Sequence, residues 1–131
     1  MSGRLTTHVL DISLGAPATG LTLQLWKLTD GTRELLRETI TNHDGRLEAP
    51  LLEGGEMEGG CYELLFMVGD YYRRANTVGM VIDSEDARGS TQRTSFFLEQ
   101  IPIRFHIGST TAHYHVPLLV APGGYSTYRG S

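Results

Sequence analysis

The chain has 131 residues, of which 40% are hydrophobic and 20% are charged, and its formal net charge is −4. This length fits one domain with its own core, and the composition is that of a soluble globular protein. The negative charge provides no basic field for nucleic acid or for an acidic membrane surface, so we expect neither as a partner. A single cysteine, Cys61, excludes an internal disulfide framework and is expected to be a buried, inert thiol.

Signals for export or membrane insertion are absent from the sequence. No apolar run reaches the length of about 18 residues that would cross a bilayer. The first ten residues, MSGRLTTHVL, lack the apolar core of a signal peptide. The last three residues, RGS, differ from the Ser-Lys-Leu peroxisomal signal. We therefore expect a cytoplasmic protein, with the peroxisome as the alternative compartment.

The first half of the chain alternates between apolar and polar residues, which is typical of half-buried strands. Turn residues separate the alternating segments at 15–20, at Asp30-Gly31 and at the Asn-His-Asp-Gly sequence of 42–45. The strands predicted between these turns are 5–12, 21–26, 34–41 and 46–52.

The second half begins with an acidic, glycine-rich loop at 53–60. Residues 70–75 can form a short helix with Asp70 as its N-cap. The polar stretch 80–94 reads as an exposed loop and forms most of a flexible insertion at about 78–94. The predicted strands of this half are 61–68, 101–107, 113–120 and 125–130.

About eight short strands, one short helix and turn signals every 8–12 residues or so predict an all-β fold. We expect an antiparallel β-sandwich formed by one domain over residues 1–131. The chain has no internal repeat, which argues against propellers and solenoids.

Two of the five histidines are spaced as neighbours on one face of a strand. His113 and His115 alternate with Tyr114, so their side chains point the same way and lie about 7 Å apart. Such a pair binds zinc when a third ligand joins it, and only a distant group such as His8 or Asp11 could do so. The alternative is that each histidine is an ordinary polar residue.

The other candidates come from a turn and from a strand. His43, in the turn, and His106, on the polar face of its strand, receive no function. Arg46 follows the turn residue Gly45 and is expected to begin a strand, where a rigid scaffold can aim a guanidinium at a ligand. A solvated arginine at a sheet edge is the alternative. No nucleophile elbow, phosphate loop or dinucleotide fingerprint occurs, and the carboxylates are scattered.

The segments LTTHVLD, TNHDGR and HYHVPLL…GYSTYRGS occur in this order along the chain. Together they resemble 5-hydroxyisourate hydrolase, of the transthyretin-related family. The terminal Tyr-Arg-Gly-Ser separates the enzymes of this family from transthyretin, the hormone carrier. The chain differs from the usual family pattern at His43, at Ala121 and Gly123, and in the length of the stretch 78–94.

The resemblance implies a two-sheet sandwich of eight strands with a short helix. It implies a homotetramer, a dimer of dimers, with active sites in the channel between dimers. The implied reaction is hydrolysis of the ring amide of 5-hydroxyisourate to 2-oxo-4-hydroxy-4-carboxy-5-ureidoimidazoline in urate degradation, without a metal or other cofactor.

Functional residues are carried over from the family motifs, and the resemblance selects His115 over His113. Those implied for catalysis are His8, Arg46, His115 and Ser131, and those implied for substrate binding are Tyr128, Arg129 and Gly130. Either His8 or His115 would be the general base, and Arg46 would hold a carbonyl or a developing oxyanion.

Two other classes of protein compete with this reading. A transthyretin-like carrier of small hydrophobic ligands would have the same fold without catalysis, but bulky Tyr128 near the chain end favours a shallow polar pocket over an open channel. An immunoglobulin-like adhesion module would need paired cysteines around a core tryptophan, and Cys61 is alone.

Overall fold

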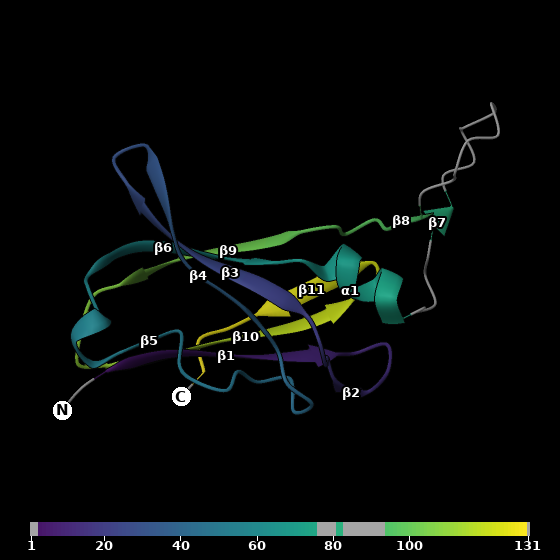
Figure 1. Cartoon of the computed structure of the whole chain (residues 1–131), viewed down its shortest axis with the longest axis horizontal. Coiled ribbons are helices and arrows are strands. Elements are labelled where there is room, and N and C mark those ends of the chain that lie inside the picture. The colour runs from purple at the N-terminus through teal and green to yellow at the C-terminus, as the bar shows by residue number, and fades with distance from the viewer. Residues whose placement is uncertain (1–2, 76–80, 83–93, 131) are drawn as a thin grey trace.

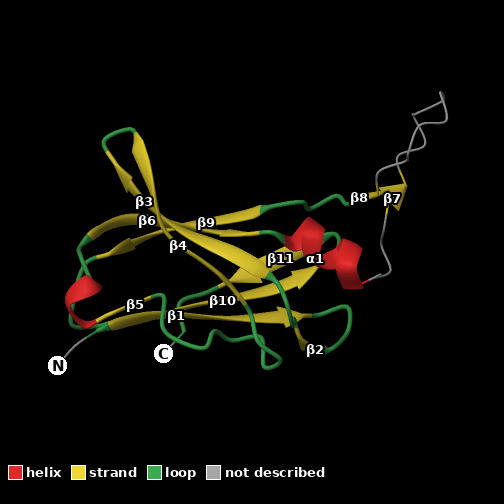
Figure 2. Cartoon of the chain, viewed as in Figure 1, coloured by secondary structure: helices red, strands yellow, loops and turns green. Residues whose placement is uncertain are grey.

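The computed structural model describes residues 3–75, 81–82 and 94–130. The strands are β1 (Arg4–Asp11), β2 (Ala16–Pro17), β3 (Thr22–Thr29), β4 (Thr32–Ile40), β5 (Leu52–Glu53), β6 (Gly60–Phe66), β7 (Val81–Ile82), β8 (Thr94–Ser95), β9 (Ile101–Ile107), β10 (His113–Ala121) and β11 (Gly124–Thr127). A 3-10 turn, η1 (Gly54–Glu56), and one helix, α1 (Val68–Ala75), complete the described elements (Figure 2). The predicted insertion at 78–94 lies outside the described residues, apart from β7 and the first residue of β8.

Apart from β7 and β8, which pair with each other as a separate two-stranded sheet, the strands form two layers, which confirms the predicted sandwich (Figure 1). One sheet has the order β11-β10-β1-β2, with β5 also paired to β1, and the other has the order β4-β3-β6-β9. The pairing of β1 with β10 is parallel, whereas the other pairings among the described strands are antiparallel. The first long strand of the chain therefore lies directly beside the strand that carries His113 and His115.

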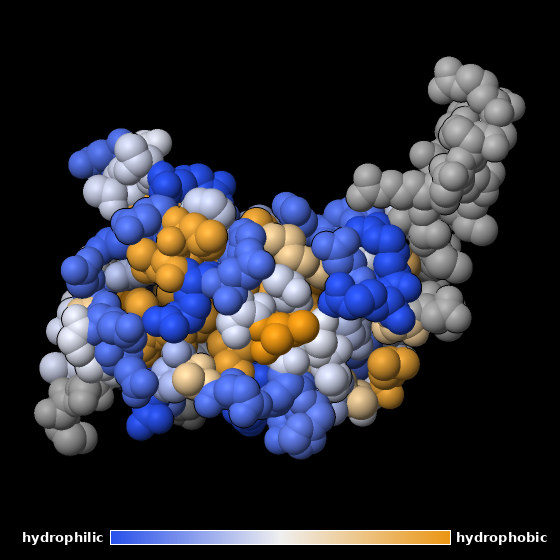
Figure 3. Space-filling model, in the orientation of Figure 1, coloured by the Kyte–Doolittle hydropathy of each residue, from blue (hydrophilic) through white to orange (hydrophobic). Residues whose placement is uncertain are grey.

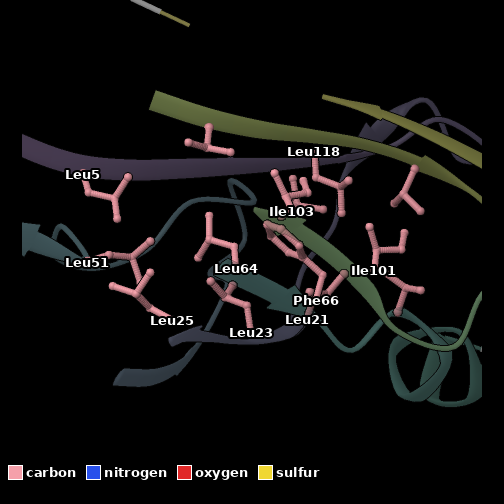
Figure 4. Close-up of a cluster of buried hydrophobic side chains, with 14 of the residues drawn as sticks. Leu5, Leu21, Leu23, Leu25, Leu51, Leu64, Phe66, Ile101, Ile103 and Leu118 are labelled. Atoms are coloured by element: carbon pink, nitrogen blue, oxygen red, sulfur yellow. The ribbon is translucent and has the colours of Figure 1, made fainter. Parts of the chain in front are cut away.

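The core fills the space between the two sheets (Figure 4). Strand β1 contributes Leu5 and Val9, and the facing sheet contributes Leu64 and Phe66, all four of them fully buried. Removing one such side chain from water stabilises the fold by about 1.5–3 kcal/mol. Because the inward residues alternate with outward ones, this burial fixes which side chains of β1 and β10 remain on the outer face of their sheet.

The segment that follows the Asn-His-Asp-Gly turn is not the predicted strand 46–52. Only Leu52 and Glu53 pair, as β5, and Arg46 lies in the loop before it. Pro50 has no N–H to give to a sheet. The side chain of Asn42 accepts the backbone N–H of Arg46 and holds that end of the segment in a turn.

Three smaller expectations also differ from the structure. Helix α1 begins at Val68, so Asp70 lies inside the first turn and is not the N-cap. The N–H of Gly69 instead donates to the carbonyl of Glu99, 2.9 Å away, which allows the earlier start. Strand β11 ends at Thr127, short of the predicted residue 130. The thiol residue Cys61 is half-buried, because it lies on the outer side of β6.

Apolar side chains on the surface are scattered. Figure 3 shows separate apolar groups among hydrophilic ones on the face turned to the viewer. The large apolar side chains that are exposed are Ile12, Leu14, Leu35, Ile40, Phe97, Tyr125 and Tyr128. Within the described residues, no helix has the length and apolar character needed to span a membrane.

Candidate active site

The parallel pairing of β1 and β10 assembles a polar surface from the two ends of the chain. Arg4 is opposite His113, Thr6 is opposite His115, and His8 is opposite Pro117. The alternate residues Leu5, Thr7 and Val9 point into the core, so Thr6 and His8 point outward, as His113 and His115 do. Both predicted histidines therefore lie on the outer face of one sheet.

His115 is held at its ring and at its backbone. Its Nδ1 lies 2.8 Å from the Thr6 hydroxyl, and its carbonyl accepts the N–H of Gly130 at 2.8 Å. A Cβ atom at position 130 would lie 2.6 Å from the His115 ring atom Cδ2, so only glycine fits there. Burial lowers the pKa of His115, and repulsion between its imidazolium and the Arg46 guanidinium lowers it further, with smaller contributions from the neighbouring rings of His8 and His113.

His8 is held by the turn 42–45. Its Nε2 lies 3.0 Å from the carbonyl oxygen of Asp44, and because a carbonyl only accepts, Nε2 carries the hydrogen. In the neutral ring the lone pair is then on Nδ1. Burial and the positive charge of Arg46 lower the pKa of His8, against a smaller opposing effect of Asp44. Both histidines are therefore neutral at pH 7 and able to accept a proton.

Arg46 is aimed by the loop that carries it. The Asn42 side chain accepts the N–H groups of Asp44 and Arg46, at 2.9 and 3.2 Å, and donates to Glu48 at 2.9 Å. Gly45 has a φ of 73°, and its carbonyl accepts the N–H of Val9, which docks the loop on β1. Among the described residues the Arg46 guanidinium has no ion pair, so its donors are available to a ligand.

A cavity of about 400 Å³ opens where the strands meet this loop. It is lined by Arg4, Thr6, Thr7, Arg46, Leu47, Glu48, Ala49, Pro50, His113 and His115. Small-molecule sites typically have about 300–1,000 Å³, so the cavity suits a ligand of a few rings at most. The lining provides guanidinium donors and two imidazole rings for such a ligand.

The predicted substrate-binding residues of the tail are divided between two places. Gly130 bridges to His115 and lies beside the cavity. The side chain of Arg129 stacks on Tyr114, with its Cζ 4.3 Å from the ring centre. Together with Tyr128 it lines a second cavity of about 290 Å³, between β9 and the tail. Ser131 lies outside the described residues.

A shared metal site was the alternative reading of the histidine pair. The rings of His113 and His115 lie 6.5 Å apart, in line with their placement on one strand face. Asp11 cannot join them, because it is fully buried on the core face of β1 and accepts the hydroxyl of Tyr71 at 2.7 Å. In the described part of the chain, no three His, Cys, Asp or Glu side chains are grouped so as to hold a metal ion.

Two residues that support the site were missed by the reading of the sequence. Thr6 bonds to His115, and Asn42 shapes the loop of Arg46. Thr6 lies on the same strand face as His8, so the period of two could have singled it out. The Asn in an Asn-x-Asp-Gly turn is a common side-chain acceptor for backbone N–H groups, which was a usable signal for Asn42.

Known proteins resemble this chain over its whole length. A 5-hydroxyisourate hydrolase of Halalkalibacterium halodurans is 50% identical over 132 residues, covering 100% of both chains. A 5-hydroxyisourate hydrolase of Pseudomonas aeruginosa is 46% identical over 98% of this chain and 92% of its own.

Solved structures share the fold. The crystal structure of an (S)-allantoin synthase superposes with a TM-score of 0.83 at 41% identity, and this chain, 99% of which is covered, spans 44% of that longer chain. The 5-hydroxyisourate hydrolase of Klebsiella pneumoniae superposes with a TM-score of 0.74 at 35% identity, over 98% of this chain and 99% of its own. The model of the HIUase/Transthyretin family matches residues 5–130. The chain therefore belongs to the HIUase/Transthyretin family.

Proposed function

We propose that this protein hydrolyses 5-hydroxyisourate, the substrate for which its relatives are named, in the degradation of urate. The observation that carries the proposal is that His115 and Arg46 line one small cavity and that His8 interacts electrostatically with both of them. The pKa of each histidine is lowered, and the Arg46 guanidinium has no ion pair among the described residues. A carrier of hydrophobic ligands has no need of two proton acceptors and an oxyanion partner at the same place. The relatives that match almost the whole chain are named as hydrolases, and this also favours catalysis over the carrier alternative.

The proposed reaction is the addition of water to a ring carbonyl, followed by cleavage of the carbon–nitrogen bond. A neutral imidazole removes a proton from water, and the resulting hydroxide attacks the carbonyl carbon. Arg46 stabilises the negative charge that develops on the carbonyl oxygen. The imidazolium then returns its proton to the departing nitrogen.

The ring nitrogens that are free for this task are defined by the hydrogen bonds. Thr6 occupies Nδ1 of His115, so Nε2 is the nitrogen left for water. Asp44 occupies Nε2 of His8, so Nδ1 is the free nitrogen of that ring. Either histidine can act as the base, and the other would then orient the water or the leaving group.

The tail would complete the substrate pocket in an assembled protein. We infer a homotetramer, a dimer of dimers, in which the outer face of the β11-β10-β1-β2 sheet lines the channel between dimers. Tyr128, Arg129 and Ser131 would there contact substrate, with Gly130 giving the His115 ring its room. The wall of the channel would be the face on which the cavity of Arg46 and His115 opens.

The test follows the absorbance decay of freshly prepared 5-hydroxyisourate with and without the protein. The variants His8→Ala, Arg46→Ala and His115→Ala are each expected to lower turnover by about 10²-fold or more, the usual scale for removing an acid–base or oxyanion group. The control is Arg37→Ala, an exposed arginine on β4 of the other sheet, which should leave the rate unchanged. An unaltered decay with wild-type protein would contradict the function, and near wild-type rates in all three variants would contradict the site.

A further inference from the structure

The Thr6 hydroxyl lies between two imidazole rings. Its Oγ1 is 3.1 Å from Nε2 of His113 and 2.8 Å from Nδ1 of His115. Thr6 is the direct register partner of His115 across the parallel pair, so the backbone holds these groups in place. Thr6, His113 and His115 together are called the relay. Both rings also line the cavity, so the relay lies at the wall of the candidate active site.

The hydroxyl has one proton, so it can donate to only one of the two rings. If it donates to His113, then Nδ1 of His115 must carry a hydrogen to make the other bond, and Nε2 of His115 keeps its lone pair. If it donates to His115 instead, Nδ1 is the acceptor, and the hydrogen of the neutral His115 ring moves to Nε2. The direction of one hydroxyl thus selects the tautomer of His115.

We propose that Thr6 is a positioning residue through which His113 sets the tautomer of His115. This inference rests on the proposed function, because it concerns the nitrogen that takes the proton from water. Neutral His113 accepts at Nε2, which turns Thr6 towards it and leaves His115 as a base. Protonated His113 can only donate, so it turns the Thr6 proton towards His115 and favours the tautomer that cannot accept at Nε2.

Charged groups approach His113 from each neighbouring segment. Arg4 is its register partner on β1, and Arg129 of the tail donates to its carbonyl at 3.4 Å. Arg46 and Glu48 of the loop line the same cavity. Three guanidinium groups and one carboxylate therefore neighbour His113, and His115 is the other imidazole on its own strand. Imidazoles titrate between about pH 5 and 8, which is the range to examine.

The kinetic test compares Thr6→Val, Thr6→Ser and His113→Gln. Thr6→Val should lower kcat about tenfold, the scale of one lost hydrogen bond, and leave KM within about twofold. Thr6→Ser restores the hydroxyl and should restore most of kcat. The control Thr32→Val removes a hydroxyl from β4 in the other sheet, where it donates to the Thr29 carbonyl, and should leave kcat and its pH profile unchanged.

The pH profile of kcat tests the coupling itself. The acid limb of the wild type should be steeper than a single titration, because protonation of either His113 or His115 suppresses the base. Thr6→Val and His113→Gln should each reduce the limb to a single titration, and the double variant should match Thr6→Val. A His113→Gln effect that persists in full in the Thr6→Val background would overturn the relay.

A readout without turnover separates this inference from the proposed function. The ¹⁵N chemical shifts of the His115 ring report its tautomer, and in the wild type above the titration range they should indicate a hydrogen on Nδ1. Thr6→Val should give a mixture of tautomers, and Thr6→Ser should not. Identical shifts in wild type and Thr6→Val would refute the inference. Altered shifts with unaltered kcat would uphold the relay and show instead that His115 is not the base.

Discussion

Gly130 is the residue on which the His115 ring depends most directly. A methyl group there would lie 2.6 Å from Cδ2 and 3.3 Å from Cγ of the ring, well inside van der Waals contact. We therefore expect Gly130→Ala to displace the imidazole and to lower kcat by about tenfold or more, since a shift of about 1 Å in a catalytic group has this scale of effect.

The control for Gly130→Ala is Gly123→Ala. A Cβ atom at Gly123 would meet no heavy atom within 4 Å, so the same chemical change should leave the rate as it was. Equal rates for Gly130→Ala and the wild type would mean that the ring position does not matter. Circular dichroism on both variants would show that the sandwich is intact.

The two site histidines should affect activity and stability on the acid side of neutrality. Burial lowers the pKa of His8 and of His115 below the ordinary value of about 6.5. Activity should therefore persist to a lower pH than an ordinary imidazole base allows, and fall as the folded pKa is passed.

Stability follows from the same pKa shifts. As the pH falls through about 6.5, the unfolded chain takes up protons that folded His8 and His115 do not, so the free energy of unfolding decreases until the folded pKa is reached. Urea unfolding at a series of pH values would measure this, and the double variant His8→Asn, His115→Asn should show a flatter dependence. A stability that rises on acidification over this range would contradict the shifts.

The sequence alone could place single residues on strand faces but could not bring distant strands into register. The His-x-His spacing correctly predicted that His113 and His115 share a face, and the resemblance supplied His8 and Arg46. Thr6 contacts His115 across 109 residues of sequence. No local pattern shows that β1 and β10 run parallel in that register, so the relay could not be read from the sequence.

At the scale of elements, the loop between β4 and β5 is the part of the site whose shape depends on a side chain. Asn42→Ala removes the acceptor for the N–H groups of Asp44 and Arg46 and so frees the loop. We expect a loss of about 1 kcal/mol of stability, the typical value of such a local bond. The catalytic efficiency should fall severalfold, because Arg46 and the Asp44 carbonyl are less well placed.

Asn42→Asp is the matched variant for this loop. The carboxylate keeps the acceptor for both N–H groups but cannot donate to Glu48, which Asn42 does at 2.9 Å. It should therefore retain more activity than Asn42→Ala. Equal kcat/KM for Asn42→Ala and wild type would indicate that the backbone of the loop holds Arg46 unaided.

The same loop shows why a sequence pattern can predict one strand correctly and another wrongly. The alternation in 101–107 predicted β9 to the residue, because both of its faces are clearly defined by burial. The segment 46–52 also mixes apolar and polar residues and was predicted as a strand. Pro50 and the side chain of Asn42 keep most of it out of the sheet. Helix α1 begins two residues early because a distant carbonyl, that of Glu99, accepts the N–H of Gly69.

For the whole molecule, the proposed homotetramer can be tested by mass. Ile12 and Leu14, 54% and 59% exposed, follow β1 at the end of the sheet that we assign to the channel. Light scattering after gel filtration should give four times the chain mass for the wild type. Ile12→Asp with Leu14→Asp should give a smaller species, because burying a carboxylate in an interface is costly.

Leu35→Asp provides the control for that pair. Leu35 is 44% exposed and lies on β4, in the other sheet, so its replacement should leave the mass as it is. A monomeric wild type at the concentrations used for kinetics would contradict the tetramer. Each active site would then be formed by a single chain.

The parallel pairing of β1 with β10 also determines at which stage of folding the active site can form. Strands β3, β4 and β6 all lie within residues 22–66 and can pair before β10 is synthesised. Strand β1 must wait for residues 113–121, and the His115 ring also needs Gly130, which follows β11. Contacts of such long separation form slowly during folding, because the loop that they close is long. A chain that stops before β10 can thus assemble one sheet and still lack every bond that holds His115, so catalysis requires residues 113–130 to be in place.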